Sequence, residues 1–297
     1  MLIKGSDRVI VQGMTGRQGR FWADRMRQCG TTIVAGSSPG KGGQEVDGVP
    51  IFDSVQDAAA TGPLDASVLF VPPLAAADAV LDAIAGGVRK IVLLTEHIPY
   101  QDTMRVIAEA NDAGAQILGP NTAGLVVPGE AAVGIMPGTA TNIFRPGRIG
   151  VLSRSGSLGT LVCLNLVSDG FGQSAFLGIG GDPILGTTTL DAVRTLDEDP
   201  GTDAVVLVGE IGGVMEEDAA AYIEHMTKPV VAFIAGRSAP PNTRMGHAGA
   251  IVTGNRGSGE SKVHALTQAG ATVVDLPSQI GAALESAGQR PLVSNVA

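Results

Sequence analysis

Residues 8–19 read RVIVQGMTGRQG, and this stretch decides the fold. The β-branched run at residues 8–11 predicts a strand, and the glycines that follow predict a tight turn into a helix over residues 16–29. Glycines at such a turn leave the N–H groups at the helix N-terminus open to phosphate. A phosphate-bearing ligand is therefore one interpretation of this turn, and a tight turn with no ligand is the other.

Short apolar strands and helices continue to alternate along the first part of the chain. We expect strands at residues 31–35, 66–71, 90–94 and 116–118, with helices over 74–85 and about 100–113. This pattern is typical of βαβ units in an open parallel sheet. Residues 119–124 (GPNTAG) then break the alternation, which predicts a domain boundary after Thr122 and a loop-rich stretch up to Pro146 and Gly147.

The alternation resumes in the second part of the chain. We expect strands at residues 149–152, 173–177, 204–208, 230–234 and 272–274, and helices at 157–169, about 187–196, 216–226, about 261–269 and 278–286. The predicted fold class is α/β, with two doubly wound domains in tandem, residues 1–122 and 123–297. Sheets of this kind bind ligands at the carboxyl ends of their strands.

Composition narrows the class of protein. The 297 residues carry a formal net charge of −9, which argues against nucleic acid or an anionic membrane as the main partner. The two cysteines, Cys29 and Cys163, are spaced for neither a disulfide framework nor a zinc site, which favours a reducing, cytoplasmic location. With no long apolar run, we expect neither a signal peptide nor a membrane span.

The glycine pattern of the first turn argues against NAD. Its spacing is G-x-x-G-x-x-G rather than G-x-G-x-x-G, and the second strand runs into residues 35–37 (AGS) without an acidic partner for a ribose hydroxyl. Residues 36–43 (GSSPGKGG) match a P-loop or a G-x-S-x-G nucleophile turn poorly, because the spacing is short and no helix start follows Ser38. Lys41 is therefore interpreted as a phosphate or adenine-side contact, or as a solvated lysine.

Three glycine- or serine-rich segments follow strands of the second domain, at residues 153–157 (SRSGS), 178–183 (GIGGDP) and 209–213 (GEIGG). Since the strands are parallel, these segments lie at one edge of the sheet. The hydroxyl groups and N–H groups of residues 153–157 predict an anion site at a helix N-terminus, with an ordinary N-cap as the alternative.

His247 lies in residues 244–250 (RMGHAGA), where small neighbours let a ligand approach the imidazole. The strand at residues 230–234 leads toward the same edge. We expect Glu210 to hold one imidazole nitrogen and leave the other for chemistry, which is the arrangement that a nucleophilic or basic histidine needs.

The other histidines predict no special chemistry. His225 and His264 fall on predicted helices and are expected at the surface, whereas His97 follows a strand end and could line a pocket of the first domain. No cluster of His, Cys and Asp has metal-ligand spacing, so no metal site is expected.

Taken together, these motifs resemble the α subunit of succinate–CoA ligase, also called succinyl-CoA synthetase. Eight of them follow one another in a single order across nearly the whole chain. They are residues 13–19, 39–43, 95–96, 119–121, 153–156, 178–183, 209–213 and 244–250.

The resemblance implies a Rossmann-like CoA-binding domain followed by a flavodoxin-like ligase domain that carries a phosphohistidine. His247 would be the phosphorylated residue and Glu210 its orienting partner. The contacts to CoA would come from Thr15, Gly16, Arg17, Gln18, Lys41, Leu94, Thr95 and Glu96. The phosphoryl group and the acid would be held by Asn121, Thr122, Ser153, Ser155, Gly156 and Thr160.

The resemblance also implies a partner, a β subunit with an ATP-grasp fold that binds ATP or GTP with Mg²⁺, in an αβ or α2β2 assembly. Two departures stand out. Thr122-Ala123 replaces the usual Cys-Pro or Cys-Ala, and Thr160 replaces a tyrosine associated with the acid substrate. Losing a large ring opens volume, so we expect an acid other than succinate, such as malate, itaconate or a sulfo-acid.

Two other classes of function remain open from the sequence. An NAD(P)-dependent oxidoreductase would bind a nicotinamide cofactor at the first turn. A non-catalytic CoA-binding module would bind CoA without any phosphorylation of His247.

Overall fold

The computed structural model describes residues 1–237, 246–247, 249 and 257–292. The chain divides into two compact units, which are described separately. The first contains Met1–Thr139 and Ile184–Thr187, and the second contains Ala140–Pro183 and Thr188–Ala297. This division concerns compactness alone, and the domain limits predicted above, 1–122 and 123–297, stay a prediction.

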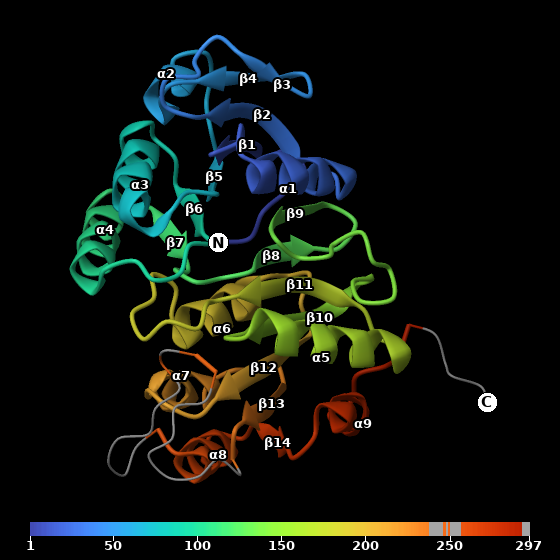
Figure 1. The fold of residues 1–297 in the computed structure, drawn as a ribbon. Coiled ribbons are helices and arrows are strands. Elements are labelled where there is room, and N and C mark those ends of the chain that lie inside the picture. The colour runs from blue at the N-terminus through green and yellow to red at the C-terminus, as the bar shows by residue number, and fades with distance from the viewer. Residues whose placement is uncertain (238–245, 248, 250–256, 293–297) are drawn as a thin grey trace. The chain divides into compact units, whose positions relative to one another are not determined.

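The first unit is built on a seven-stranded sheet (Figure 1). Its strands are β1 (Arg8–Gln12), β2 (Thr32–Ser37), β3 (Glu45–Val46), β4 (Val49–Phe52), β5 (Ala66–Leu69), β6 (Lys90–Leu93) and β7 (Gln116–Leu118). They lie in the order β3-β4-β2-β1-β5-β6-β7, and only β3 runs antiparallel to its neighbour. Without β3, the order by sequence is 3-2-1-4-5-6, which is that of dinucleotide-binding sheets, with a ligand crevice expected between β1 and β5.

Helices cover both faces of this sheet. They are α1 (Arg17–Gln28), α2 (Val55–Ala59), α3 (Ala76–Ala85), which follows the 3-10 turn η1 (Pro73–Ala75), and α4 (Tyr100–Asp112). In Figure 1, α3 and α4 lie together on one side of β5 and β6, and α1 lies on the other. Helix α1 buries Gly19, Ala23 and Met26, a spacing that places one stripe against the strands.

The predicted loop-rich stretch after residue 122 is wrong in part. It contains an antiparallel hairpin of β8 (Gly124–Val127) and β9 (Ala131–Gly134). A Cβ on Gly124 would lie 2.0 Å from the carbonyl oxygen of Val133, so the two chains approach closely only because this residue is glycine. Strands β3 and β4 and helix α2 were also not predicted, because elements of two to five residues carry too little periodicity to detect.

The second unit contains five parallel strands: β10 (Pro146–Ser153), β11 (Gln173–Gly178), β12 (Ala204–Glu210), β13 (Val230–Ala235) and β14 (Thr272–Val274). They lie in the order β14-β13-β12-β10-β11. Numbered within the unit, this order is 2-1-3-4-5, the flavodoxin-like arrangement, whose switch point lies between β10 and β12. The predicted fold class is thereby confirmed.

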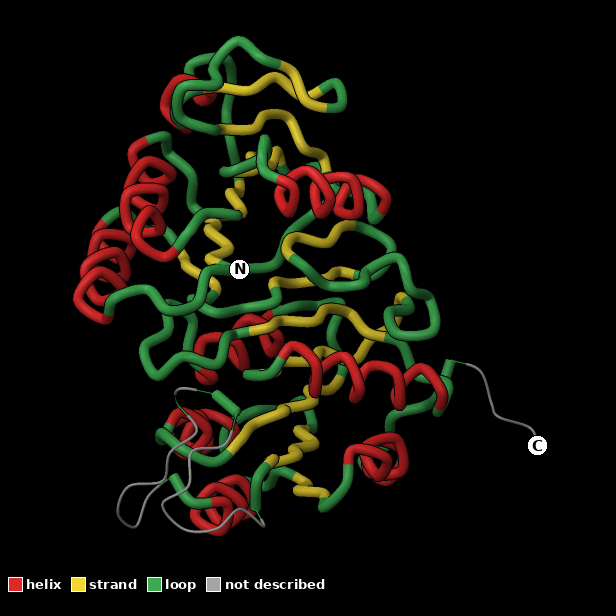
Figure 2. Tube along the Cα trace, in the orientation of Figure 1, coloured by secondary structure: helices red, strands yellow, loops and turns green. Residues whose placement is uncertain are grey.

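The helices of this unit alternate with its strands, as Figure 2 shows by colour. They are α5 (Gly156–Ser168), α6 (Thr189–Glu198), α7 (Met215–Ile223), α8 (Gly259–Gln268) and, after the 3-10 turn η2 (Pro277–Gln279), α9 (Ile280–Ser286). His264 lies exposed on α8, as predicted. His225 is also exposed, but it lies in the turn after α7, because that helix ends before the predicted residue 226.

The last five residues of β10 and all seven of β12 are buried, which explains their continuous apolar runs. Val151, Phe176 and Leu207 have no exposed surface. Within the described part of the chain, no helix combines the length and the apolar character needed to cross a lipid bilayer.

Candidate functional site

The turn after β1 is closed by glycines that no other residue could replace. Gly13 has φ +78°, and a Cβ there would lie 2.3 Å from the carbonyl oxygen of Phe70, which follows β5. A Cβ on Gly19 would lie 2.4 Å from the carbonyl oxygen of Gly13. The turn therefore packs tightly at the switch point of the first sheet, where a ligand is expected.

The N-terminus of α1 is open at this turn. Its N-cap, Gly16, has extended backbone and makes no side-chain cap hydrogen bond, and Thr15, Arg17 and Gln18 are exposed beside it. The hydroxyl of Thr15 lies 2.9 Å from that of the buried Ser38, which ties this turn to the loop after β2. First-turn N–H groups without a side-chain acceptor suit the phosphates of an anionic ligand such as CoA.

Two pockets flank the segment Phe70–Val71, which lines both. The first has a volume of about 530 Å³ and brings together Gln18 with Leu94, Thr95 and Glu96, four of the eight predicted CoA contacts. His97 lines the same pocket, as the sequence suggested. The second, of about 460 Å³, is lined by Gly13, Ser37, Ser38, Pro39 and Asp53 among others. The second pocket reaches Gly13 of the glycine turn, and the first reaches Gln18 in the first turn of α1.

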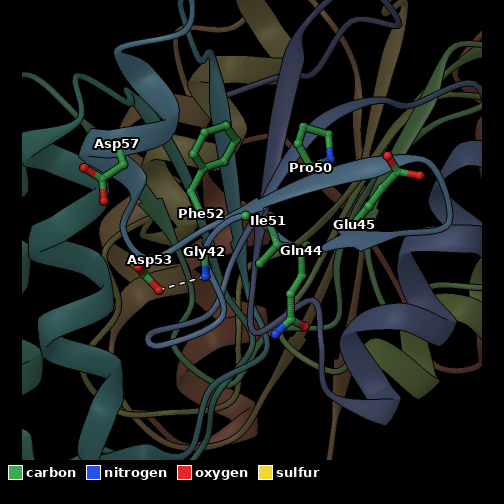
Figure 3. A pocket seen from close by; sticks show the side chains of 9 residues that line it. Gly42, Gln44, Glu45, Pro50, Ile51, Phe52, Asp53 and Asp57 are labelled. Carbon is green, nitrogen blue, oxygen red and sulfur yellow. Dashed lines mark hydrogen bonds between the residues drawn. The ribbon is translucent and has the colours of Figure 1, made fainter.

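Lys41 lies on an exposed turn and lines neither of these pockets. Figure 3 shows the pocket of about 430 Å³ next to its loop, lined by residues 42–45, 50–53 and Asp57. The N–H of Gly42 donates to Oδ1 of Asp53 at 2.9 Å, so the loop is closed by a carboxylate of this chain. No helix follows Ser38, which agrees with rejecting the nucleophile-turn interpretation.

The second unit brings His247 and Glu210 together. Nδ1 of His247 lies 2.7 Å from Oε2 of Glu210, the last residue of β12. The Glu210 side chain is 11% exposed and that of His247 is 29% exposed. The hydrogen bond with the Glu210 carboxylate raises the pKa of His247 above its ordinary value, although burial and the nearby Arg154 oppose this shift.

Arg154 joins three strand ends. It directly follows β10, and its side chain is 2% exposed. One guanidinium nitrogen, Nη1, lies 3.5 Å from Oε1 of Glu210 and donates to the carbonyl oxygen of Gly212 at 3.4 Å. The other, Nη2, donates to the carbonyl oxygen of Asp182 at 3.3 Å. The segments after β10, β11 and β12 therefore meet at this cation.

His247 packs directly on the segment after β11. A Cβ on Gly181 would lie 2.6 Å from Cδ2 of the imidazole, so glycine is required for this contact. The N–H of Gly249 donates to the carbonyl oxygen of Gly181 at 3.3 Å. Of the predicted segment 244–250, only residues 246, 247 and 249 lie within the described residues.

The hydroxyl groups at the start of α5 take part in local hydrogen bonds. The buried Ser153 donates to the carbonyl oxygen of Ser155 at 2.7 Å, and Ser155 accepts from the N–H of Leu158 as the N-cap. Thr160 donates to the carbonyl oxygen of Gly156 at 2.7 Å. The ordinary N-cap that the sequence left open is thus present.

Asn121 and Thr122 lie after β7 in the first unit. Asn121 has φ +53°, and its N–H donates to the carbonyl oxygen of Thr95 at 3.0 Å. Thr122 is buried, and its hydroxyl accepts from the N–H of Gly124 at 2.9 Å. Asn121 thereby lies next to the segment that lines the larger pocket.

A buried ion pair beside Glu210 was not predicted from the sequence. Lys262 of α8 and Glu216 of α7 have no exposed surface and contact each other directly. A signal was available, because α8 buries Gly259, Lys262 and Leu266, the spacing of an apolar stripe with a lysine on it.

Among the residues that the structure describes, no three His, Cys, Asp or Glu side chains lie close enough to hold a metal ion together. The polar groups at this edge of the second sheet are instead the imidazole of His247, the carboxylates of Glu210 and Asp182, the guanidinium of Arg154 and the start of α5. Of these, the guanidinium and the helix N-terminus suit a phosphoryl group.

Comparisons with known families match both units. Residues 5–97 match the model of the CoA binding domain, and residues 152–272 match that of the CoA-ligase family. The ADP-forming succinate–CoA ligase subunit alpha 2 of Archaeoglobus fulgidus is 49% identical over 280 residues, which cover 94% of this chain and 96% of that protein.

Two further comparisons bear on specificity and on the fold. A subunit of an ADP-forming sulfoacetate–CoA ligase from Bilophila wadsworthia is 43% identical over 96% of this chain and 98% of its own length. An ATP citrate lyase from Methanothrix soehngenii has the same fold, with a TM-score of 0.86 over 100% of this chain and 52% of its own chain, at 22% identity.

A CoA-binding domain followed by a CoA-ligase domain defines the class, the α subunits of acid–CoA ligases. Within that class, the chain belongs to the succinate–CoA ligase α-subunit family. The family resemblance predicted from the sequence is confirmed, and the alternative of an NAD(P)-dependent oxidoreductase is not favoured.

Proposed function

We propose that this chain is the α subunit of an ADP- or GDP-forming acid–CoA ligase in which His247 carries the phosphoryl group. The observation that carries the proposal is the contact between His247 and Glu210 at the switch point of the second sheet. A carboxylate on Nδ1 holds the imidazole in the tautomer whose Nε2 has a lone pair.

In the first step, Nε2 of neutral His247 attacks the terminal phosphorus of a nucleoside triphosphate. The N–P bond forms, the bond from phosphorus to the bridging oxygen breaks, and the nucleoside diphosphate leaves. The ring gains positive charge in this step, and Glu210, which accepts a hydrogen bond from Nδ1–H, stabilises that charge.

In the second step, a carboxylate oxygen of the acid attacks the phosphorus, the N–P bond breaks and an acyl phosphate forms, which leaves His247 neutral. In the third step, the CoA thiolate attacks the acyl carbon and inorganic phosphate leaves, while the thiol proton goes to solvent. The acyl phosphate is needed because a free carboxylate has no leaving group that a thiolate could displace.

The start of α5 is proposed to hold the phosphoryl group. The N-terminal end of the helix and the hydroxyl groups of Ser153 and Ser155 suit a dianion, together with the backbone at Gly156. We propose that the acid substrate is held by Asn121, Thr122 and Thr160. The hydrogen bond between Ser155 and the N–H of Leu158 is compatible with this role, since the other first-turn N–H groups can still donate.

CoA is proposed to lie on the first unit, with its phosphates at the open N-terminus of α1. Thr15, Gly16, Arg17 and Gln18 would contact it there, and Leu94, Thr95 and Glu96 would contact it in the larger pocket. Lys41 would reach it from its exposed turn, and its charge suits a phosphate.

The nucleotide and Mg²⁺ are proposed to bind to a β subunit with an ATP-grasp fold, in an αβ or α2β2 assembly in the cytoplasm. The relatives are named as α subunits, which supports a partner. The low usage of cysteine supports a reducing location.

The acid is proposed to differ from succinate, because Thr160 stands where the family has a tyrosine. The sulfoacetate–CoA ligase subunits among the relatives support an acid of altered charge or size. Malate, itaconate and a sulfo-acid are the candidates. Assayed with the β subunit, a preference for succinate over all other acids would contradict this assignment.

The function is tested by acyl-CoA formation in the complex with the β subunit, with ATP or GTP, Mg²⁺, CoA and a panel of acids. The wild type is expected to release one nucleoside diphosphate for each acyl-CoA, and His247→Asn is expected to form none. CoA binding without turnover of any acid would instead support a non-catalytic CoA-binding module.

A further inference from the structure

The ion pair between Lys262 and Glu216 lies at the contact between α7 and α8. These helices pack side by side in the second unit (Figures 1 and 2). Both side chains are fully buried, although lysine and glutamate are rarely found in that environment. Two charges removed from water carry a large desolvation cost, so their hydrogen-bond partners show what the pair holds.

Those partners belong to the backbone of Glu210. The N–H of Glu210 donates to Oε1 of Glu216 at 3.2 Å, and Nζ of Lys262 donates to the carbonyl oxygen of Glu210 at 2.7 Å. Nζ also donates to the carbonyl oxygen of Gly212 at 2.7 Å and to Oε2 of Glu216. All three ammonium hydrogens are therefore used, and both backbone polar groups of Glu210 bind to one buried ion pair.

Gly209 allows this close approach. A Cβ on Gly209 would lie 2.7 Å from Oε1 of Glu216, so a larger residue would push the glutamate away from the N–H of Glu210. The last two residues of β12 thus have different roles. Gly209 leaves space for the ion pair, and Glu210 is hydrogen-bonded to it.

A second contact between the same helices holds the chain at residue 257, just before α8. The N–H of Gly257 donates to Oε1 of Glu217 at 3.0 Å, and the hydroxyl of Ser261 contacts the same oxygen. The carbonyl oxygen of Gly257 accepts from the N–H of Gly212 at 2.8 Å. The start of α8 is thereby bonded to the segment that follows Glu210.

We infer that Lys262 and Glu216 are positioning residues for the reaction, which hold the backbone of Glu210 so that its carboxylate reaches Nδ1 of His247. The inference rests on the proposed function only in giving His247 and Glu210 their catalytic parts. Neither Lys262 nor Glu216 touches the imidazole in the described contacts, so they act through Glu210.

The test uses the double variant Lys262→Met/Glu216→Leu. Replacing both partners by apolar side chains of similar volume removes the pair without leaving one buried charge uncompensated, so the fold is expected to persist. The control is Lys228→Met in the same unit. Lys228 also donates to three backbone carbonyl oxygens, those of Leu196, Asp197 and Asp199, but these lie at the C-terminal end of α6 rather than at Glu210.

The first readout is the titration of His247 by NMR in the full chain, with His247→Asn to assign its signal. In the wild type, Glu210 raises the pKa of His247, so the double variant is expected to titrate at lower pH, nearer the ordinary histidine value of about 6.5. In the Lys228→Met variant, His247 is expected to titrate at the same pH as in the wild type. An unchanged titration of His247 in a folded double variant would overturn the inference.

The second readout is the rate of His247 phosphorylation in the complex with the β subunit. A small displacement of Glu210 is expected to lower this rate by about 100-fold in the double variant, with CoA affinity unchanged. An equal rate in the double variant and the wild type would overturn the inference. If the wild type incorporates no phosphate at all but its His247 titration still depends on the ion pair, the proposed function fails and the positioning of Glu210 stands.

Discussion

Nδ1 of His247 and Oε2 of Glu210 are 2.7 Å apart, at the carboxyl edge of the flavodoxin-like sheet. The contact fixes the orientation of the ring and raises the pKa of His247. The carboxylate of Glu210 has two opposing effects on catalysis. The carboxylate stabilises the charge that the ring gains on phosphorylation, but it also increases the fraction of protonated ring, which has no lone pair for attack.

The rate of His247 phosphorylation is therefore expected to depend on pH with a defined sign. Because only the neutral imidazole attacks phosphorus, the rate rises with pH and levels off above the pKa of His247. That midpoint is expected above the ordinary value of about 6.5. Rapid-quench measurement of phosphate incorporation between pH 5 and 9, in steps of about half a pH unit, gives the midpoint of the rate profile. A midpoint at or below the ordinary value would contradict the part given to Glu210.

Glu210→Gln retains the shape of the side chain but removes its charge. The plateau rate of phosphorylation is expected to fall by about 100-fold or more, since the ring loses the group that stabilises its charge. The midpoint of the pH profile is expected to move to lower pH, because the hydrogen bond with the carboxylate is the largest cause of the raised pKa of His247. Stopped-flow or quench assays on both proteins measure the two effects, and a lower plateau with an unshifted midpoint speaks against this cause.

Arg154→Met is expected to shift the pH profile of His247 phosphorylation to higher pH, opposite to the shift expected for Glu210→Gln. The positive charge of Arg154 lowers the pKa of His247, so its removal moves the midpoint to higher pH. Glu210 also loses a buried cationic partner, which is expected to cost about 3 kcal/mol in the free energy of unfolding. Urea denaturation measures the cost. Arg148→Met, which breaks an exposed pair with Asp203, serves as the control and is expected to leave the pH profile unchanged.

Gly181→Ala tests the packing of the His247 imidazole against residue 181. Its Cβ would lie 2.6 Å from Cδ2 of His247, so the ring must move away from its position beside Glu210. Gly181 does not have a positive φ, so alanine introduces no backbone strain. Phosphorylation is expected to fall by about 100-fold, while CoA affinity, measured by calorimetry on the same protein, is unchanged. A fully active Gly181→Ala variant would show that the ring has room at this contact.

Gly13→Ala tests the CoA site. Alanine at φ +78° with its Cβ 2.3 Å from the Phe70 carbonyl oxygen forces the turn apart, and CoA affinity is expected to fall by at least about 10-fold. Gly87→Ala is the matched control. Gly87 has φ +83° but no atom within 4 Å of a Cβ, so it introduces strain without a clash and should leave CoA affinity unchanged. Equal losses in both variants would assign the effect to stability alone.

The sequence predicts the fold well where elements are long and periodic. Each domain's alternation of strand and helix implies a parallel sheet, and the glycine turn at residues 13–19 marks the first switch point. The hairpins β3–β4 and β8–β9 escape prediction, because each strand has only two to four residues. Their pairing is local in sequence, but it depends on a close approach of the two backbones, such as that of Gly124 to Val133, which a short run of residues does not reveal.

The candidate site was likewise predictable from the sequence only in part. The convergence of Ser153, Asp182 and Glu210 follows from topology, since parallel strands end at one edge. The roles of Arg154 and Lys262 depend on side-chain direction across three or four elements, which no local pattern specifies. The sequence gives Lys262 only a position on a buried helix stripe, and its partner Glu216 is 46 residues away.

The most direct test of the account is phosphorylation of His247 itself. The chain is incubated with its β subunit, ATP or GTP and Mg²⁺, and phosphate bound to protein is measured by ³¹P NMR and by acid lability. The account predicts one acid-labile phosphate per chain, on a histidine nitrogen, that disappears in His247→Asn and on addition of the acid and CoA. Absence of phosphate from the wild type, or its retention in His247→Asn, would contradict the account.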